Sequence, residues 1–263
     1  MTIYHYTSIE SLALILKHKT FRFNRLDRVD DLEESIYSSG DIGIKLGQYC
    51  FVSCWTKDPS ENIALWKMYT DFKGVRIAID EDLFVSYPVN NTFNSYFSDF
   101  VHFEEDCMFP VSNNEVRLYD VIYVPDNDKK IKSLITHSGD RMTVDTSSVG
   151  LYKKDNWKFQ NECRFKLWAM PIDNSKIKQP KDNRAFSILW NVIEAMVPSL
   201  GSNYNINTLY KDMPIREDIL KNMHVMLGPD CTEAERIIVE SLLSALCNNP
   251  VEDSFFKGKI RRK

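Results

Sequence analysis

A histidine and a glutamate are the side chains of this chain best placed to do chemistry. His5 lies near the end of a short run of aromatic and β-branched residues, 3–6, which is typical of a strand. Glu162 begins the alternating segment 162–168, two residues before Arg164. A carboxylate facing a cleft stabilises developing positive charge or binds a hydroxyl, and an imidazole at a strand–helix junction lies where backbone N–H groups favour polar or anionic ligands.

The strand pattern also predicts the surroundings of both residues. Because side chains alternate between the faces of a strand, His5 shares the face of Ile3 and is expected to be partly buried. A buried imidazole needs hydrogen-bond partners, and the alternative to a functional role is a histidine that the core satisfies. For Glu162 the alternative is a surface ion pair with Arg164 on the same strand face.

Other candidates carry weaker signals. Ser53 lies on the predicted strand 49–55 between aromatic residues, where a serine is unremarkable. Trp66 and Tyr69 are three residues apart on a predicted helix, and the simplest interpretation places them in the core. The chain has no phosphate-binding glycine loop, no dinucleotide-binding glycine motif, no nucleophile elbow and no zinc-protease motif. A Ser–His–Asp triad has no identifiable nucleophile.

Composition places the chain among ordinary globular proteins. It has 263 residues, 43% hydrophobic and 27% charged, and a net charge of −4, so nothing draws it as a whole to nucleic acid or membranes. Residues 257–263 are locally basic, which indicates a solubilising end or a nucleic-acid contact. The apolar stretch 186–200 is interrupted and too short to span a bilayer, and no secretory signal is visible. We therefore predict a cytoplasmic protein without a membrane partner.

The six cysteines show no C-x-x-C pair, which favours reduced thiols and no metal site. Hydrophobic periodicity predicts one α+β domain over residues 1–263, with a core over 1–170 and a mostly helical region over 171–263 packed on it. Capping boxes at Thr7-x-x-Glu10 and Thr232-x-x-Glu235 predict helix starts. The acidic segment 27–34 is interpreted as solvated, and Ile237 and Ile238 are expected to face inward. Predicted strands cover residues 3–6, 20–23, 49–55, 75–79, 120–125, 162–168 and 225–228.

Short motifs in a fixed order resemble a bacterial family catalogued as domain of unknown function 2971. They are Tyr-His-Tyr-Thr-Ser at 4–8, Phe-Val-Ser at 51–53, Leu-Trp-x-x-Tyr at 65–69, Lys-Gly-Val-x-Ile-x-Ile-Asp at 73–80, and the segment 153–164. The chain differs from the family pattern in the acidic segment near residue 30 and at Cys163. The order of a histidine strand, a middle strand with Ser or Tyr and a late glutamate strand looks like the His–Tyr–Glu layout of ADP-ribosyltransferases, most of all the DNA-modifying toxin and RNA 2′-phosphotransferase branches.

This resemblance implies a split, mostly antiparallel sheet that binds NAD in a central cleft, with flanking helices. Glu162 would hold the ribose 2′-hydroxyl and stabilise an oxocarbenium-like transition state, and His5 would donate to a ribose hydroxyl. Ser53 would complete the catalytic set. The remaining NAD-binding candidates are Thr7 and Arg22 at the phosphates, Tyr69 at the nicotinamide, and Trp66 and Arg164.

Three classes of function remain open from the sequence. The first is an NAD-dependent ADP-ribosyltransferase or NAD glycohydrolase, such as a toxin or a phage-defence effector, whose acceptor is a protein, DNA or RNA. The second is a non-catalytic module of the same fold that binds a nucleotide or a protein. The third is a nucleic-acid-modifying enzyme. Residues 171–263 are candidates for a lid, a homodimer surface or a substrate platform.

Overall fold

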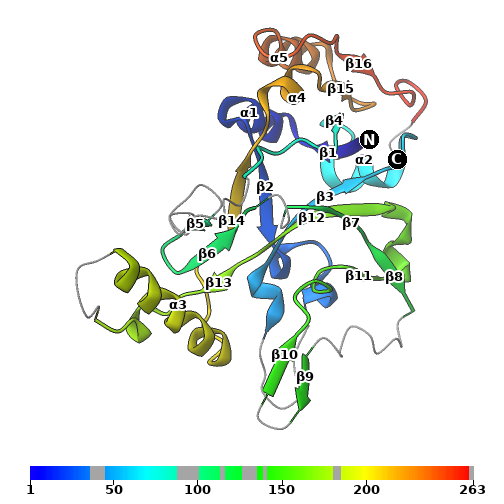
Figure 1. Ribbon diagram of the computed structural model, residues 1–263. Coiled ribbons are helices and arrows are strands. Elements are labelled where there is room, and N and C mark those ends of the chain that lie inside the picture. Colours follow the sequence, from blue (N-terminus) through cyan, green and yellow to red (C-terminus); the bar gives the residue numbers. More distant parts are fainter. Residues whose placement is uncertain are drawn as a thin grey trace.

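The computed structural model describes residues 1–35, 45–87, 101–112, 116–125, 135–138, 141–179 and 185–260. The architecture is mixed α+β with a mostly antiparallel sheet, as predicted (Figure 1). In the main sheet the strand order is β14-β2-β3-β1-β4-β15-β16, and β12 pairs with both β3 and β7. Its strands are β1 (Thr2–Thr7), β2 (Thr20–Arg25), β3 (Cys50–Thr56), β4 (Val75–Asp80), β7 (Leu118–Asp120), β12 (Glu162–Trp168), β14 (Tyr210–Pro214), β15 (His224–Leu227) and β16 (Glu252–Asp253).

Smaller sheets and five α-helices complete the described fold. Their strands are β5 (Val101–Phe103), β6 (Cys107–Pro110), β8 (Ile122–Val124), β9 (Ile135–Ser138), β10 (Arg141–Val144), β11 (Tyr152–Lys154) and β13 (Met170–Pro171). The helices are α1 (Ile9–His18), α2 (Ile63–Thr70), α3 (Ala185–Gly201), α4 (Glu217–Lys221) and α5 (Glu233–Leu243). In Figure 1, α1 lies beside α5, whereas α3 lies apart beside β13.

The main sheet forks along β3. One edge of this strand pairs with β12 over its whole length, through the register Glu162↔Thr56 to Trp168↔Cys50. The other edge pairs with two different strands, with β2 at residues 51 and 52 and with β1 only at Tyr4↔Thr56. Residues 53–55 therefore have no ladder partner on that edge. A gap opens there between two half-sheets, and it positions the candidate site.

Burial on both faces explains why β3 and β12 lie at the centre. Along β12 the first six side chains are buried, and along β3 all but Cys54. Phe51, Trp55 and Phe165 belong to the main core, which also holds Leu12, Ile15 and Leu16 of α1. These three α1 residues are three or four positions apart or adjacent, so they lie on one face of the helix. A smaller apolar cluster of Tyr6, Leu65, Trp66 and Phe72 joins α2 to β1.

Three local predictions, about the start of a helix, the burial of acidic residues and the bounds of a strand, are wrong. The cap of α1 is Ser8, whose hydroxyl accepts from the Ser11 backbone N–H at 3.1 Å, because Thr7 is still in strand β1. In the acidic segment Asp31 and Glu34 are buried rather than solvated, since Glu34 meets cations that arrive from distant strands. The predicted strand 120–125 is two strands, β7 and β8, interrupted at Val121.

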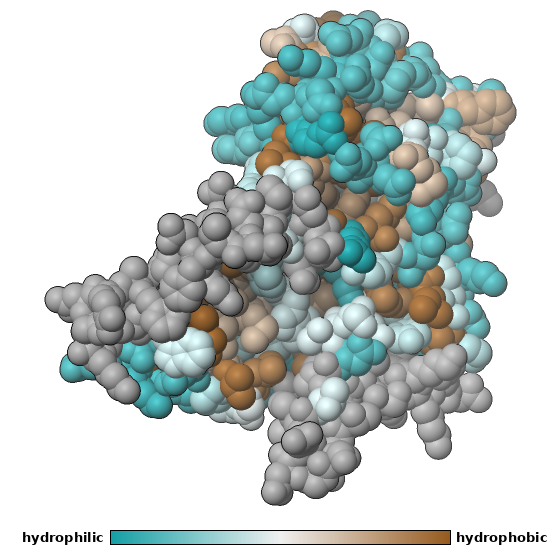
Figure 2. Space-filling model, viewed as in Figure 1, coloured by the Kyte–Doolittle hydropathy of each residue, from teal (hydrophilic) through white to brown (hydrophobic). Residues whose placement is uncertain are grey.

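The C-terminal region contributes more than the predicted helices. It adds β14 to the edge of β2, and β15 to the edge of β4. The capping box of Thr232 and Glu235 begins α5 as predicted, yet Ile237 and Ile238 are about half exposed, because α5 buries Val239 and Leu243 instead. Figure 2 shows the upper part of the molecule, where α4 and α5 lie, as mostly hydrophilic. No helix in the described part of the chain is long and apolar enough to cross a membrane.

Candidate active site

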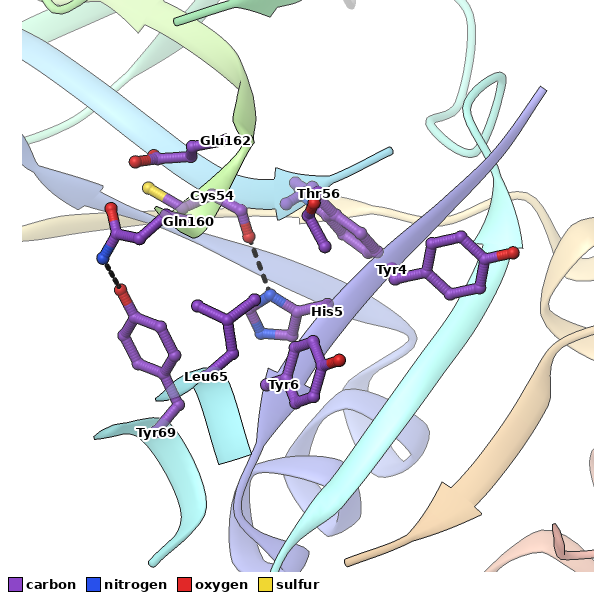
Figure 3. A pocket seen from close by; sticks show the side chains of 10 residues that line it. Tyr4, His5, Tyr6, Cys54, Thr56, Leu65, Tyr69, Gln160 and Glu162 are labelled. Carbon is purple, nitrogen blue, oxygen red and sulfur yellow. Dashed lines mark hydrogen bonds between the residues drawn. The ribbon is translucent and has the colours of Figure 1, made fainter. Parts of the chain in front are cut away.

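A cavity of about 380 Å³ lies where the main sheet forks (Figure 3). His5 and Glu162, which are far apart in sequence, both line it. The remaining lining residues come from β1, β3, α2 and the turn before β12; they are Tyr4, Tyr6, Cys54, Trp55, Thr56, Leu65, Tyr69 and Gln160.

His5 bridges the fork. Its Nδ1 lies 2.8 Å from the backbone oxygen of Cys54, at the part of β3 that has no ladder partner. A carbonyl only accepts hydrogen bonds, so Nδ1 carries the proton and Nε2 of the neutral ring is an acceptor. Burial lowers the pKa of His5 and outweighs the hydrogen bond to Cys54, which acts in the opposite direction. The lowered pKa favours the neutral form of the ring. Trp55 and Phe21 pack against the ring, with centroids 5.0 and 5.9 Å away.

Glu162 is buried and ion-paired rather than placed at the surface. Its Oε1 accepts from Nη2 of Arg164 at 2.5 Å, and its Oε2 lies 3.2 Å from Nζ of Lys153. Burial alone would raise the pKa of Glu162, but Arg164 and Lys153 outweigh it and hold the pKa below its ordinary value. The carboxylate is therefore ionised at the wall of the cavity.

The same two cations bind further carboxylates behind the cavity wall. Arg164 donates to Oε2 of Glu34 at 2.8 Å, and Lys153 lies 3.3 Å from Oε1 of Glu34 and 3.5 Å from Oδ1 of Asp30. Lys153, Glu34 and Arg164 are each 1% exposed. We call these four residues with Glu162 the ion cluster. With all three carboxylates ionised, the ion cluster carries one net negative charge.

A hydrogen-bonded triad closes the side of the cavity opposite His5. Tyr69 donates its hydroxyl proton to Oδ2 of Asp30 at 2.8 Å. Gln160 donates from Nε2 to the Tyr69 oxygen at 2.8 Å and to the same Asp30 oxygen at 3.3 Å. Burial and the Asp30 carboxylate raise the pKa of Tyr69, so its hydroxyl stays protonated. Asp30 thus links the triad to the ion cluster.

The predicted site residues separate into three groups. His5, Tyr69 and Glu162 line the cavity. Thr7, Arg22 and Ser53 line a larger adjoining groove of about 1790 Å³ that also reaches His5 and Tyr69. In that groove Ser53 accepts from the Trp55 indole at 3.0 Å, and Arg22 already forms a two-bond pair with Asp212, 2.9 and 3.0 Å long. Ser53 therefore does not join His5 and Glu162 in the cavity as a catalytic partner.

Trp66 and Arg164 do not line the cavity. Trp66 is fully buried in the cluster between α2 and β1, and its indole donates to Glu61 at 2.8 Å. Arg164 is held in the ion cluster behind Glu162. Neither side chain is positioned to touch a ligand, so Trp66 fits its alternative interpretation as a core residue.

Sequence reasoning missed several residues that shape the site, namely Asp30, Glu34, Cys54, Lys153 and Gln160. The strand register gives the reason for Cys54, which lies directly opposite Arg164 and so on the face of Glu162. That pairing is visible only once β3 and β12 are aligned. For Gln160 a weak signal exists, because it precedes Glu162 by two residues at the entrance to an alternating strand.

Within the described ranges no group of His, Cys, Asp and Glu side chains could hold a metal ion. Comparisons with known proteins give no assignment: no family model, no curated protein and no solved structure matches the chain. The resemblance to the domain of unknown function 2971 family and to ADP-ribosyltransferases therefore stays a prediction, and the site has to be interpreted from its own chemistry.

Proposed function

We propose that this protein cleaves the nicotinamide–ribose bond of NAD, as an ADP-ribosyltransferase-like enzyme or an NAD glycohydrolase. The observation that carries the proposal is the convergence of His5 and Glu162 in one cavity at the fork of the sheet. A split sheet with a histidine on its first strand and a glutamate on a late strand is the layout that the sequence resemblance implies. The acceptor, whether protein, DNA, RNA or water, and a role in toxicity or phage defence belong to the same proposal.

The electrostatics of the cavity suit this reaction. Cleavage passes through an oxocarbenium-like transition state, which a nearby carboxylate stabilises. Glu162 is ionised, and the ion cluster behind it carries a net negative charge when its carboxylates are ionised. The nicotinamide ring of NAD is cationic before cleavage. Attraction to the wall therefore favours the bound substrate and increases as charge develops on the ribose.

The hydrogen-bonding groups suit a ribose. Nε2 of the neutral His5 ring is an acceptor. His5 would therefore accept a hydrogen bond from a ribose hydroxyl, whereas the sequence suggested that it donates one. Glu162 would accept from a neighbouring hydroxyl. Leu65, Trp55 and Tyr69 supply apolar and aromatic surface for the nicotinamide ring. The adjoining groove, lined by Thr7 and Arg22 among others, leaves room for the rest of the dinucleotide.

The test is release of nicotinamide from labelled NAD by the purified protein and by three variants. His5→Ala and Glu162→Gln are expected to lower turnover roughly 10²-fold or more, the scale of losing one electrostatic stabiliser. Glu240→Gln, an exposed carboxylate on α5, is the matched control and should keep full activity. Thermal unfolding of each variant separates loss of chemistry from loss of fold. Absence of both NAD binding and NAD turnover would remove the proposal.

A second candidate function has one observation in its favour. Both oxygens of Glu162 already have cationic partners, Arg164 and Lys153, which is how a purely structural carboxylate would be held. This favours a non-catalytic module that binds a nucleotide without cleaving it. Tight binding of NAD by equilibrium dialysis, with no nicotinamide released over hours, would select this alternative.

A further inference from the structure

Gln160 has a buried oxygen that the protein leaves without a hydrogen-bond partner. This residue ends the 3₁₀ helix Asp155–Gln160 just before β12, is 3% exposed, and lines the cavity. Its Oε1 has no partner in the part of the chain that the structure describes, whereas Nε2 is bonded to Tyr69 and Asp30. A buried acceptor without a donor is costly, so each such atom in a native structure calls for an explanation, of which a functional role is one.

The chemistry of the triad fixes which end of the amide faces the ligand. A carboxylate only accepts, so the group of Gln160 that contacts Asp30 must be the NH₂. The Tyr69 hydroxyl gives its own proton to Asp30 and can therefore also accept from this NH₂. Flipping the amide would place oxygen against oxygen. Figure 3 shows the result, with the amide oxygen on the side of Cys54 and Glu162.

Two other side chains that line the cavity, His5 and Glu162, also present acceptors. Nε2 of His5 accepts in the neutral ring, and Glu162 is a carboxylate. The Cys54 thiol is only a weak donor, and Thr56 donates to the backbone oxygen of Asn161 at 2.9 Å. A ligand that satisfies Gln160, His5 and Glu162 together must therefore bring N–H or O–H donors.

We infer that Gln160 is a specificity-determining residue, whose Oε1 accepts a hydrogen bond from the carboxamide NH₂ of nicotinamide. This inference rests on the proposed function and names how the site recognises the leaving group. A primary amide has two N–H donors on one nitrogen, so it can satisfy Gln160 together with a second acceptor of the wall. A hydroxyl has one donor and can satisfy only one of these acceptors. Asp30 and Tyr69 act as positioning residues that hold the Gln160 oxygen in place.

The experiment compares NAD with its acetylpyridine analogue, in which a methyl group replaces the amide nitrogen. The analogue keeps the carbonyl, the ring and the positive charge but has no N–H donor. Dissociation constants measured by calorimetry on the intact protein should favour NAD roughly 10- to 100-fold, the cost of leaving a buried acceptor unpaired. In Gln160→Met, which keeps the volume without the amide, the preference should fall below about threefold, mainly through weaker binding of NAD.

Gln48→Met is the matched control, because Gln48 is a buried glutamine that bonds to Asn203 away from the cavity. It should keep the preference of the unaltered protein. Equal binding of NAD and the analogue by the unaltered protein overturns the role of Gln160 without any variant, and so does a Gln160→Met protein that still discriminates. In both cases NAD binding itself leaves the proposed function standing. If neither dinucleotide binds, the proposed function and this inference fail together.

Discussion

Replacing Lys153 with methionine tests whether the ion cluster is as buried and as interdependent as its geometry indicates. The Lys153 ammonium is 1% exposed and lies 3.2–3.5 Å from carboxylate oxygens of Asp30, Glu34 and Glu162. Methionine keeps most of the volume and removes the charge. Arg164 is then left with three carboxylates, so two net negative charges remain where there was one.

The expected loss of stability follows from these distances. At an effective dielectric constant of about 20, two unit charges about 3.3 Å apart attract by roughly 5 kcal/mol, before desolvation and like-charge repulsion are subtracted. Removing one partner of a buried ion pair costs about 3–5 kcal/mol in practice, and we expect Lys153→Met to fall in that range. For a chain of this size this corresponds to a decrease of roughly 6–20 °C in Tm.

The loss should also depend on pH in a defined direction. Burial raises the pKa of Glu34 even with Arg164 and Lys153 beside it, so Glu34 is the carboxylate that takes up a proton when Lys153 is removed. A pKa raised in the folded state means that the folded protein binds more protons than the unfolded chain. The variant therefore regains stability as the pH falls through the folded pKa of Glu34, and the penalty should be smaller at pH 5 than at pH 7.5.

Urea unfolding followed by tryptophan fluorescence measures these differences, with Lys57→Met as the control. Lys57 forms an exposed ion pair with Asp120, so its replacement should cost no more than about 1 kcal/mol. Adding Glu34→Gln to Lys153→Met removes the surplus charge and should restore about 1–3 kcal/mol at pH 7.5. A Lys153→Met penalty as small as that of the control, or one that grows as the pH falls, would refute the description of a buried cluster.

Three further predictions concern the fork and its supports. The folded pKa of His5 lies below the ordinary value of about 6.5. The stability that the neutral ring contributes is therefore complete above pH 6.5 and is lost as the pH falls towards the folded pKa. His5→Asn should accordingly flatten the curve of Tm against pH between pH 7.5 and 5. Gly74→Ala should cost about 1–3 kcal/mol in urea unfolding, because a Cβ would lie 2.2 Å from the Thr7 backbone oxygen, whereas Gly201→Ala, with open space around it, should be nearly neutral. Thr232→Ala should cost about 1 kcal/mol by removing the cap of α5, and a Tm equal to that of the unaltered protein would contradict the capping box.

The strands of the main sheet could be predicted because their patterns are local. Alternation places the predicted β3 and β4 within a residue of their observed bounds, and β12 exactly at Glu162–Trp168. Burial of charge could not be predicted in the same way. Glu34 lies in an acidic segment whose sequence suggests a solvated loop. Its burial is possible because cations from β11 and β12 offset the cost of removing its carboxylate from water. Likewise the exposure of Ile237 depends on which face of α5 packs against α1 and the core.

The candidate site likewise has a part that local sequence predicts and a part that depends on long-range contacts. His5 and Glu162 could be selected from residue type and strand position, whereas the cavity between them depends on long-range pairing. β1 meets β3 at a single register position, and no local pattern in either strand specifies that the ladder stops there. Gln160 was missed because its one sequence signal, a position two residues before Glu162, is weak. Its importance comes from Asp30 and Tyr69, which orient it from distant parts of the chain.

The fork explains why fold and site are coupled at His5. Where β1 leaves β3, the Cys54 carbonyl loses the backbone donor that a continuous sheet would supply, and the His5 ring supplies a side-chain donor in its place. That bond fixes the tautomer and turns Nε2 into an acceptor. The same gap that creates the cavity therefore also sets the hydrogen-bonding character of one wall. Glu162 and Gln160 add further acceptors to the cavity lining. Under the proposed function, the ribose hydroxyls and the carboxamide of NAD would supply the matching donors.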